Sequence, residues 1–451
     1  MSTQRDIDWN ALLEVLVLAN WNTRVVVLGV TALGIAGGVV GTFMLLRRRA
    51  LLGDALSHAT LPGIVLAFLV ASALGIGGKS HGILLLGALV SGTLGIFAVH
   101  WLTSSGRLSE DSALGVVLST FFGAGAALLG LAQQESSASA AGLETFIYGK
   151  TASMLVRDAI LIGATSIATV GCCVVFFKEL RLICFDPDFA RGRGMRTGIY
   201  DFLLMSLVMA VVVVGLQAVG LVLVIAILVI PAAAARFWTN MTGRMLLTSG
   251  FIGGLGGWLG TMLSALAPGL PAGAMVVLAL GGIFLVSLLL GRRRGLLRRI
   301  IRLRRRALLM ERDHALRAIW ECLEQSGTHD CLGSHIGFRR GWATFRTAKR
   351  LQHAGLLVVE AVEGGDERIS FTPSGEREAA SVVRRHRLWE HYLMRRADFD
   401  EQHVDRGADD LEHLLPIDLL EELEKELDAD TRAMLPSPHS LHPDGPGGGG
   451  S

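Results

Sequence analysis

Long apolar stretches constrain the fold of this chain more than any other feature of its sequence. A helix that crosses a membrane needs about 20 mostly apolar residues. About nine stretches meet this length, at residues 24–46, 55–74, 82–101, 112–131, 157–177, 199–216, 218–238, 247–267 and 274–290. Hydrophobic residues make up 51% of the chain and charged residues 18%, which is too apolar for an ordinary soluble protein. The sequence therefore predicts an all-α polytopic membrane domain.

Basic residues fall in alternate connections between these stretches. They follow the first, third, fifth, seventh and ninth stretch, and the first such connection holds Arg47, Arg48 and Arg49. Lys and Arg accumulate in the cytoplasmic loops of membrane proteins. We therefore expect a multi-pass protein of the plasma membrane, with its N-terminus outside and the segment after residue 291 in the cytoplasm.

Two ionisable residues, Asp54 and His58, interrupt the start of the second stretch. At a spacing of i, i+4 they share one helix face. A charged group inside a membrane costs about 2.5–3.5 kcal/mol, and a carboxylate with an imidazole forms a suitable ligand pair for a divalent transition metal. We expect Pro62 and Gly63 to break the helix where it lines a cavity. The alternative is that Asp54 caps the helix and His58 is a packing residue.

Four stretches in a fixed order carry a family resemblance. They are "RRRALLGDALSHATLPGIVLAFLV", "LSEDSALGVVLSTFFGAGAALL", "KELRLICFDPDFARGRGM" and "LQAVGLVLVIAILVIPAAAARF". Together they resemble the permease subunit of the zinc, manganese and iron family of ABC importers, over residues 10–295. The resemblance implies a homodimeric membrane subunit, a separate cytoplasmic ATPase and an extracellular metal-binding protein.

This resemblance also assigns roles to particular residues. It implies that Asp54 and His58 belong to the metal path. It implies that a coupling helix docks on the ATPase through Phe185, Asp186, Ala190 and Gly194. The chain contains no GxxxxGK[ST] phosphate-binding loop. We therefore expect it to be no enzyme, and ATP hydrolysis to come from a partner protein.

The polar part of the chain begins with a basic cluster. Residues 292–312 include about ten arginines. A juxtamembrane cluster of this kind favours contact with anionic membrane lipid, and nucleic acid is the second candidate partner. The following residues predict a winged helix, with an apolar helix face at Leu316, Ile319, Trp320 and Leu323 and a second helix beginning in "CLGSHIGF". Its candidate DNA contacts are Arg339, Arg340, Arg346, Lys349 and Arg350. The alternative is a solvated basic helix.

Histidines and carboxylates are dense in the last part of the chain. His386 and Glu390 share a helix face, and so do Asp409, Glu412 and His413, which suits Mn, Fe or Zn. Residues 311–430 resemble the iron- and manganese-dependent repressors of the diphtheria toxin repressor family. The resemblance implies one metal site at His386, Glu390 and His403, and another at His314, Asp409, Glu412 and His413.

These observations predict five segments. They are a permease domain at 1–295, a basic juxtamembrane linker at 296–310, a winged-helix-like domain at 311–375, metal-binding and dimerisation helices at 376–435, and a flexible tail at 436–451. The leading hypothesis is a divalent-metal importer permease with a cytoplasmic metal-sensing domain, which needs Mn, Fe or Zn and no organic cofactor. One alternative is a membrane-anchored, metal-dependent transcription regulator. Another is that the tail is a dimerisation module without metal.

Overall fold

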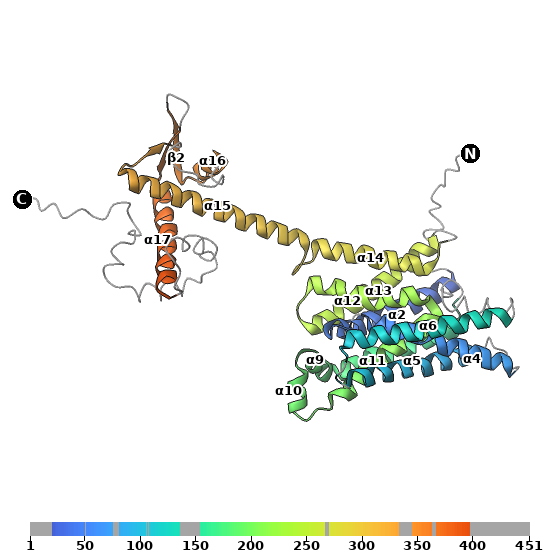
Figure 1. Ribbon diagram of the computed structural model, residues 1–451. Helices are drawn as coiled ribbons and strands as arrows, with labels where there is room; N and C mark the ends of the chain where they lie inside the picture. Colours follow the sequence, from blue (N-terminus) through green and yellow to red (C-terminus); the bar gives the residue numbers. More distant parts are fainter. Residues whose placement is uncertain are drawn as a thin grey trace, which may run out of the picture. The chain divides into compact units, whose positions relative to one another are not determined.

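The chain forms two compact units, Met1–Arg299 and Ile300–Ser451. The computed structural model describes residues 20–49, 51–74, 81–104, 106, 108–135, 154–266, 270–332, 345–362 and 367–396 (Figure 1). Each unit has its own buried apolar core. The two units are therefore described one at a time.

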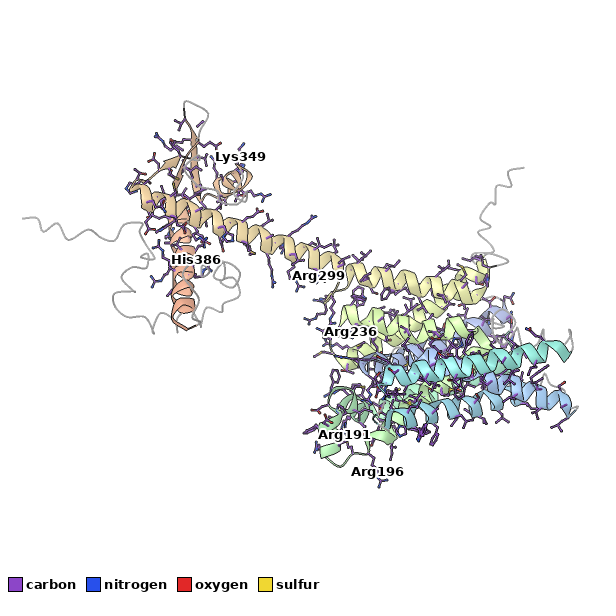
Figure 2. All side chains as sticks on the ribbon, viewed as in Figure 1. Arg191, Arg196, Arg236, Arg299, Lys349 and His386 are labelled. Carbon is purple, nitrogen blue, oxygen red and sulfur yellow. The ribbon has the colours of Figure 1, made fainter. Side chains whose placement is uncertain are left out.

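The first unit is a bundle of long helices. Its helices are α2 (Trp21–Leu46), α3 (Leu52–Ala59), α4 (Leu61–Ala73), α5 (His81–Ser104), α6 (Glu110–Glu135), α8 (Val156–Val175), α9 (Phe177–Phe185), α10 (Pro187–Gly192), α11 (Thr197–Val219), α12 (Leu221–Trp238), α13 (Thr242–Leu266) and α14 (Ala272–Leu290). The short helices α9 and α10 lie at one end of the bundle (Figure 1). Arg191, Arg196 and Arg236, which we expected on the cytoplasmic side, gather at that same end (Figure 2).

Eight helices in the described part of the chain are long and apolar enough to cross a membrane. The remaining predicted span, 218–238, falls on α12, an apolar helix of 18 residues. Gly220 separates α11 from α12 with φ +85°, a conformation that side chains with a Cβ rarely adopt. The polytopic helical domain is confirmed.

The helix break that we expected at Pro62 and Gly63 is present just before them. The interruption falls at Thr60, between α3 and α4, and Thr60 itself keeps helical angles of φ −75° and ψ −25°. Pro62 lies in the first turn of α4, where its missing N–H removes no helical hydrogen bond. Gly63 is instead a packing residue, because a Cβ there would lie 2.0 Å from the carbonyl oxygen of Gly87 on α5.

Small residues bring α2 and α13 together at the centre of the bundle. A Cβ on Gly34 would lie 2.2 Å from the carbonyl oxygen of Gly253, so the two backbones touch. The Ser249 hydroxyl donates a hydrogen bond of 2.6 Å across the same interface to the carbonyl oxygen of Gly38. Close helix contact through Gly and Ser is typical of membrane domains, in which lipid leaves no hydrophobic force between helices.

The second unit packs helices against a small antiparallel sheet. Its elements are α15 (Leu296–Ser326), which starts in the first unit, β1 (Cys331–Leu332), α16 (Phe345–His353), β2 (Leu357–Ala361), β3 (Glu367–Phe371) and α17 (Pro373–Arg396). The strand order is β1-β3-β2, and Leu357 pairs with Phe371. The predicted apolar face of α15 is confirmed, because Leu316, Ile319, Trp320 and Leu323 are all buried in this core.

Two sequence expectations change in this unit. Cys331 and Leu332 form strand β1, paired with Ile369 and Arg368, instead of beginning a helix. The rest of that predicted helix, residues 333–338, lies outside the described residues. The predicted basic linker, 296–310, is the first half of α15, which continues as one helix into the second unit's core.

Candidate functional site

Helix α3 carries the two ionisable residues of the second span. The Nε2 atom of His58 lies 3.4 Å from Oδ1 of Asp54, so the structure brings the predicted pair together. The imidazole packs edge-on against the Phe122 ring of α6, with ring centroids 4.9 Å apart. The other imidazole nitrogen, Nδ1, is buried and has no hydrogen-bond partner among the described residues. This imidazole nitrogen could therefore contact a bound ligand.

The chemistry of this pair suits a passing cation. A carboxylate oxygen and an imidazole nitrogen are both good ligands for Mn, Zn or Fe. The Asp54 side chain is 32% exposed and that of His58 is 19% exposed, so an ion could reach them. In the part of the chain that the structure describes, no group of three or more His, Cys, Asp or Glu side chains could hold a metal. Two such side chains alone fall short of the protein ligands that hold a permanent structural ion.

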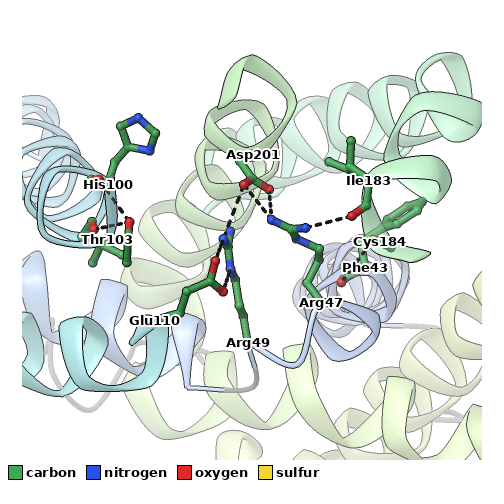
Figure 3. Close-up of polar contacts among 10 residues, drawn as sticks. Phe43, Arg47, Arg49, His100, Thr103, Glu110, Ile183, Cys184 and Asp201 are labelled. Atoms are coloured by element: carbon green, nitrogen blue, oxygen red, sulfur yellow. Dashed lines mark hydrogen bonds and ion pairs between the residues drawn. The ribbon is translucent and has the colours of Figure 1, made fainter. Parts of the chain in front are cut away.

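A charge clamp, which we define as Arg47, Arg49, Glu110 and Asp201, lies beside α3 at the end of α2 (Figure 3). Arg47 Nη2 contacts both Asp201 carboxylate oxygens at 2.6 Å, and Arg47 Nη1 donates 2.8 Å to the carbonyl oxygen of Ile183 on α9. Arg49 Nε donates 2.7 Å to Glu110, and Nη2 lies 3.4 Å from Asp201. Two positive and two negative side chains thus neutralise one another where α2, α3, α6 and α11 begin or end.

The clamp lies close in sequence to α3. Arg49 is buried, and α3 begins shortly after it at Leu52. Burial alone would lower the pKa of Arg49, but the hydrogen bond to Glu110 and the charge of Asp201 outweigh it and raise that pKa. Arg49 is therefore a permanent cation. Sequence reasoning missed the role of Glu110 here. The signal was present in the arginines that end one span and the acids that begin later ones.

The predicted coupling segment is a helical turn with an aromatic surface. Asp186 caps α10 by accepting a hydrogen bond of 2.9 Å from the Phe189 N–H. Ala190 is fully buried, and Gly194 has φ +80°. These three residues shape the turn. Phe185 is 63% exposed, as a docking residue should be, and so is the unpredicted Phe189 at 52%. Exposed aromatic residues of this kind are typical anchors of protein interfaces.

Of the predicted metal ligands in the second unit, His386 and His314 are described. His386 is 3% exposed, on α17 (Figure 2). The Nη1 atom of Arg317 lies 2.8 and 2.6 Å from its two ring nitrogens. The Arg317 guanidinium is thus a close polar partner of this imidazole. His314 is half-buried on α15.

The remaining predicted residues of the second unit are described only in part. Lys349 and Arg350 are exposed on α16, and Arg350 lies 3.6 Å from Glu311. Glu390 and Arg346 lie on described helices, but their side chains fall outside the described set. The whole residue is outside the described part of the chain for His403, Asp409, Glu412, His413, Arg339 and Arg340.

Comparison with known proteins identifies the first unit. Residues 21–291 match the ABC 3 transport family. The chain belongs to the ABC 3 transport family. This permease also matches the iron dependent repressor, metal binding and dimerisation domain over residues 372–436. Both resemblances drawn from the sequence are therefore confirmed, and the permease is a multi-pass membrane protein.

Relatives of the permease include two transport-system membrane proteins. It is 38% identical over 374 residues to the manganese transport system membrane protein MntC of Bacillus subtilis, which covers 83% of this chain and 84% of that protein. It is 43% identical over 293 residues to the zinc transport system membrane protein TroC of Treponema pallidum, over 65% of this chain and 97% of that protein. A solved structure, PsaBC from Streptococcus pneumoniae in complex with Fab, is 28% identical with a TM-score of 0.53, over 62% of this chain and 97% of that one.

Proposed function

We propose that the permease moves divalent transition metal ions, Mn, Zn or Fe, into the cell as the membrane subunit of an ABC importer. The observation that carries this proposal is the Asp54 and His58 pair, with the orphaned Nδ1 of His58 beside it. The manganese and zinc systems named among its relatives support the same cargo class. A cation that meets the carboxylate and the imidazole exchanges part of its hydration shell for them.

Metal uptake by cells tests this function. Cells that lack their own Mn²⁺ and Zn²⁺ importers should accumulate radiolabelled Mn²⁺ or Zn²⁺ when they express the full chain with its ATPase and metal-binding partner proteins. Asp54→Asn and His58→Ala should each lower uptake by about tenfold or more, because one of two first ligands is lost. His100→Ala, at an exposed histidine on α5, is the matched control. Unchanged uptake in both α3 variants would remove this assignment.

In this proposal a partner protein supplies the energy for transport by hydrolysing ATP. We infer that a cytoplasmic ATPase docks on α9 and α10, that an extracellular protein delivers the metal and that two copies of the permease pair in the membrane. Exposed Phe185 and Phe189 support the ATPase contact. The clamp supports a mechanical role, because Arg47 ties the α9 backbone to the end of α2, close to α3.

Co-purification tests the docking segment. An ATPase subunit that purifies with the tagged permease should be lost when Phe189→Ser removes an interface anchor. Met241→Ser is the control, because Met241 is 61% exposed in another connection that we place on the cytoplasmic side. Equal loss in both variants would indicate general misfolding and contradict a docking role for Phe189.

The second unit is proposed as a cytoplasmic metal sensor that adjusts transport. Its match to a metal-binding and dimerisation domain supports this role. Uptake should respond to cytosolic metal in the wild-type chain and lose that response in the His386→Ala and Glu412→Ala, His413→Ala variants. The same metal response in all of them would contradict a sensor at these residues.

A second candidate function is metal-dependent DNA binding. The observation in its favour is that α16 exposes Lys349 and Arg350 next to the β2–β3 hairpin. A gel shift with the full chain in detergent, with and without Mn²⁺ or Fe²⁺, tests it. A sequence-specific shift that Lys349→Gln weakens supports it, and the lack of any specific shift removes it.

A further inference from the structure

The first half of α15 is a helix surface that is exposed among the described residues. We call residues 296–309 the basic amphipathic segment. Every residue in it is exposed, including Leu303 at 55% and Ile300 at 39%. Burial begins only at residue 310 and becomes complete at Asp313, where the helix enters the second unit's core. A row of exposed leucine and isoleucine side chains indicates a surface that binds an apolar partner or a membrane.

Charge and apolarity separate around this helix. Leu296, Ile300 and Leu303 follow one another at helical spacing and define one face. Leu297, Ile301 and Leu308 lie next to that face and widen it. Arg298, Arg302 and Arg305 define the opposite face at the same spacing. The segment is therefore mostly apolar on one side and mostly cationic on the other, with Arg304 inside the apolar side and Leu309 inside the cationic side. The long Arg304 side chain can extend from an apolar surface to the headgroups.

The structure fixes where this segment begins. The turn after α14 docks on the end of α12, because the N–H groups of Arg293 and Arg294 donate to the carbonyl oxygen of Phe237 at 2.9 and 3.3 Å. Gly291 has no room for a side chain in this turn, since a Cβ there would lie 2.5 Å from the carbonyl oxygen of Ser287. α15 thus starts at Leu296, only a few residues after a membrane-spanning helix ends at Leu290.

The chemistry of the segment selects among its occupants. A nucleic acid would neutralise the arginines but leave the apolar face in water. A second copy packed along the same face would bring two arginine-rich helices together, which repel each other. An anionic lipid surface satisfies both faces, because acyl chains cover the leucines and headgroup phosphates pair with the arginines.

We propose that the basic amphipathic segment lies in the cytoplasmic surface of the membrane and binds anionic phospholipid. α15 is continuous up to Ser326 and contributes Leu316 and Trp320 to the core of the second unit. Lipid bound to the segment therefore acts on the same helix on which that core is built. This surface is independent of the transported metal and of the ATPase.

Hydrogen exchange of the full chain in lipid nanodiscs tests the proposal. Amides of residues 296–309 should exchange about tenfold more slowly in nanodiscs of phosphatidylcholine with phosphatidylglycerol than in phosphatidylcholine alone. The triple change Arg298→Gln, Arg302→Gln and Arg305→Gln should abolish the difference. The same three positions changed to Lys should retain it, because the positive charges remain. Leu303→Ser with Ile300→Ser should weaken protection in both lipids.

Other outcomes overturn the proposal. Equal exchange in the two lipids would show that anionic headgroups do not bind there. Protection that grows with protein concentration in neutral detergent would assign the face to a second copy, and protection that appears only with added duplex DNA would assign it to nucleic acid. All altered side chains are exposed, so unchanged thermal unfolding of the variants confirms that the fold is retained.

Discussion

The guanidinium of Arg47 lies 2.6 Å from both carboxylate oxygens of Asp201, although the two residues are 154 positions apart in the chain. The pair joins the end of α2 to the first turns of α11, which follow α10 in the chain. A second hydrogen bond from Arg47 reaches the carbonyl oxygen of Ile183 in α9. The inner ends of these helices are therefore held together by charge as well as by packing.

Removing the anion at the centre of the charge clamp should destabilise the permease. In the Asp201→Asn variant, Arg47 and Arg49 lose a charge partner while they stay mostly buried. Loss of one partner from a buried pair costs about 3–5 kcal/mol, and the partial exposure of Asp201 reduces this to about 2–3 kcal/mol. Denaturant unfolding of the full chain in detergent measures the change.

The exposed ion pair of the same region is the control for this prediction. Arg191 and Asp188 lie 2.8 Å apart on α10, and both side chains are mostly exposed. Asp188→Asn should therefore change the free energy of unfolding by less than about 1 kcal/mol. If Asp201→Asn and Asp188→Asn have equal effects, the clamp does not contribute as its burial implies.

Phe122 should orient His58 for its role in transport. The edge-on contact of the two rings, with centroids 4.9 Å apart, is worth about 0.5–1.5 kcal/mol. Phe122→Ala keeps both metal donors but lets the imidazole move, so Mn²⁺ or Zn²⁺ uptake should fall about two- to tenfold. Phe97→Ala, at a 64% exposed ring on α5, should leave uptake unchanged. An uptake defect of the same size at Phe97 would contradict a specific role for Phe122.

Alanine at Gly63 on α4 and alanine at Gly82 on α5 should have sharply different effects on stability. A Cβ on Gly63 would lie 2.0 Å from the carbonyl oxygen of Gly87, whereas one on Gly82 meets nothing within 4 Å. Gly63→Ala should push α4 from α5 and cost about 1–3 kcal/mol. Gly82→Ala should be neutral or stabilise by up to about 1 kcal/mol, since alanine favours helix. Thermal unfolding of both variants in detergent compares them directly, and equal melting temperatures would contradict the close contact.

The second unit should lose stability at alkaline pH through Cys331. Burial, with a smaller contribution from the Cys322 thiol, raises the pKa of Cys331 from 9.0 to about 12. The folded state therefore holds this proton more tightly than the unfolded state does. The stabilisation is fully present below pH 9 and is lost as the pH rises from 9 to 12.

Alkylation with iodoacetamide, followed by mass spectrometry, measures this effect. At pH 8 iodoacetamide should alkylate Cys331 far more slowly in the folded chain than in the chain unfolded in urea, because the thiolate is the reacting form. The pH dependence of unfolding between 9 and 12 should shrink in Cys331→Ala. Equal alkylation rates in the folded and the urea-unfolded chain would show that the Cys331 thiol is not buried and that its pKa is not raised.

Much of this architecture could be predicted because its signals are local. Apolar runs long enough to cross a bilayer predicted the spans, and the face of Leu316, Ile319, Trp320 and Leu323 predicted the core of the second unit. The spacing of Asp54 and His58 placed both side chains on one helix face. Where sequence reasoning was wrong, as at Cys331, a local propensity yielded to strand pairing with β3.

By itself, the sequence determined the membrane domain, the basic end of the bundle, the family and the shared helix face of Asp54 and His58, because each depends on composition or on spacing within one helix. Only the tertiary structure decided what those residues touch. It placed Phe122 on His58, Asp201 on Arg47 and the Arg317 guanidinium on His386. These partners lie 64, 154 and 69 positions apart, and no local pattern encodes contacts that arise when separate helices pack.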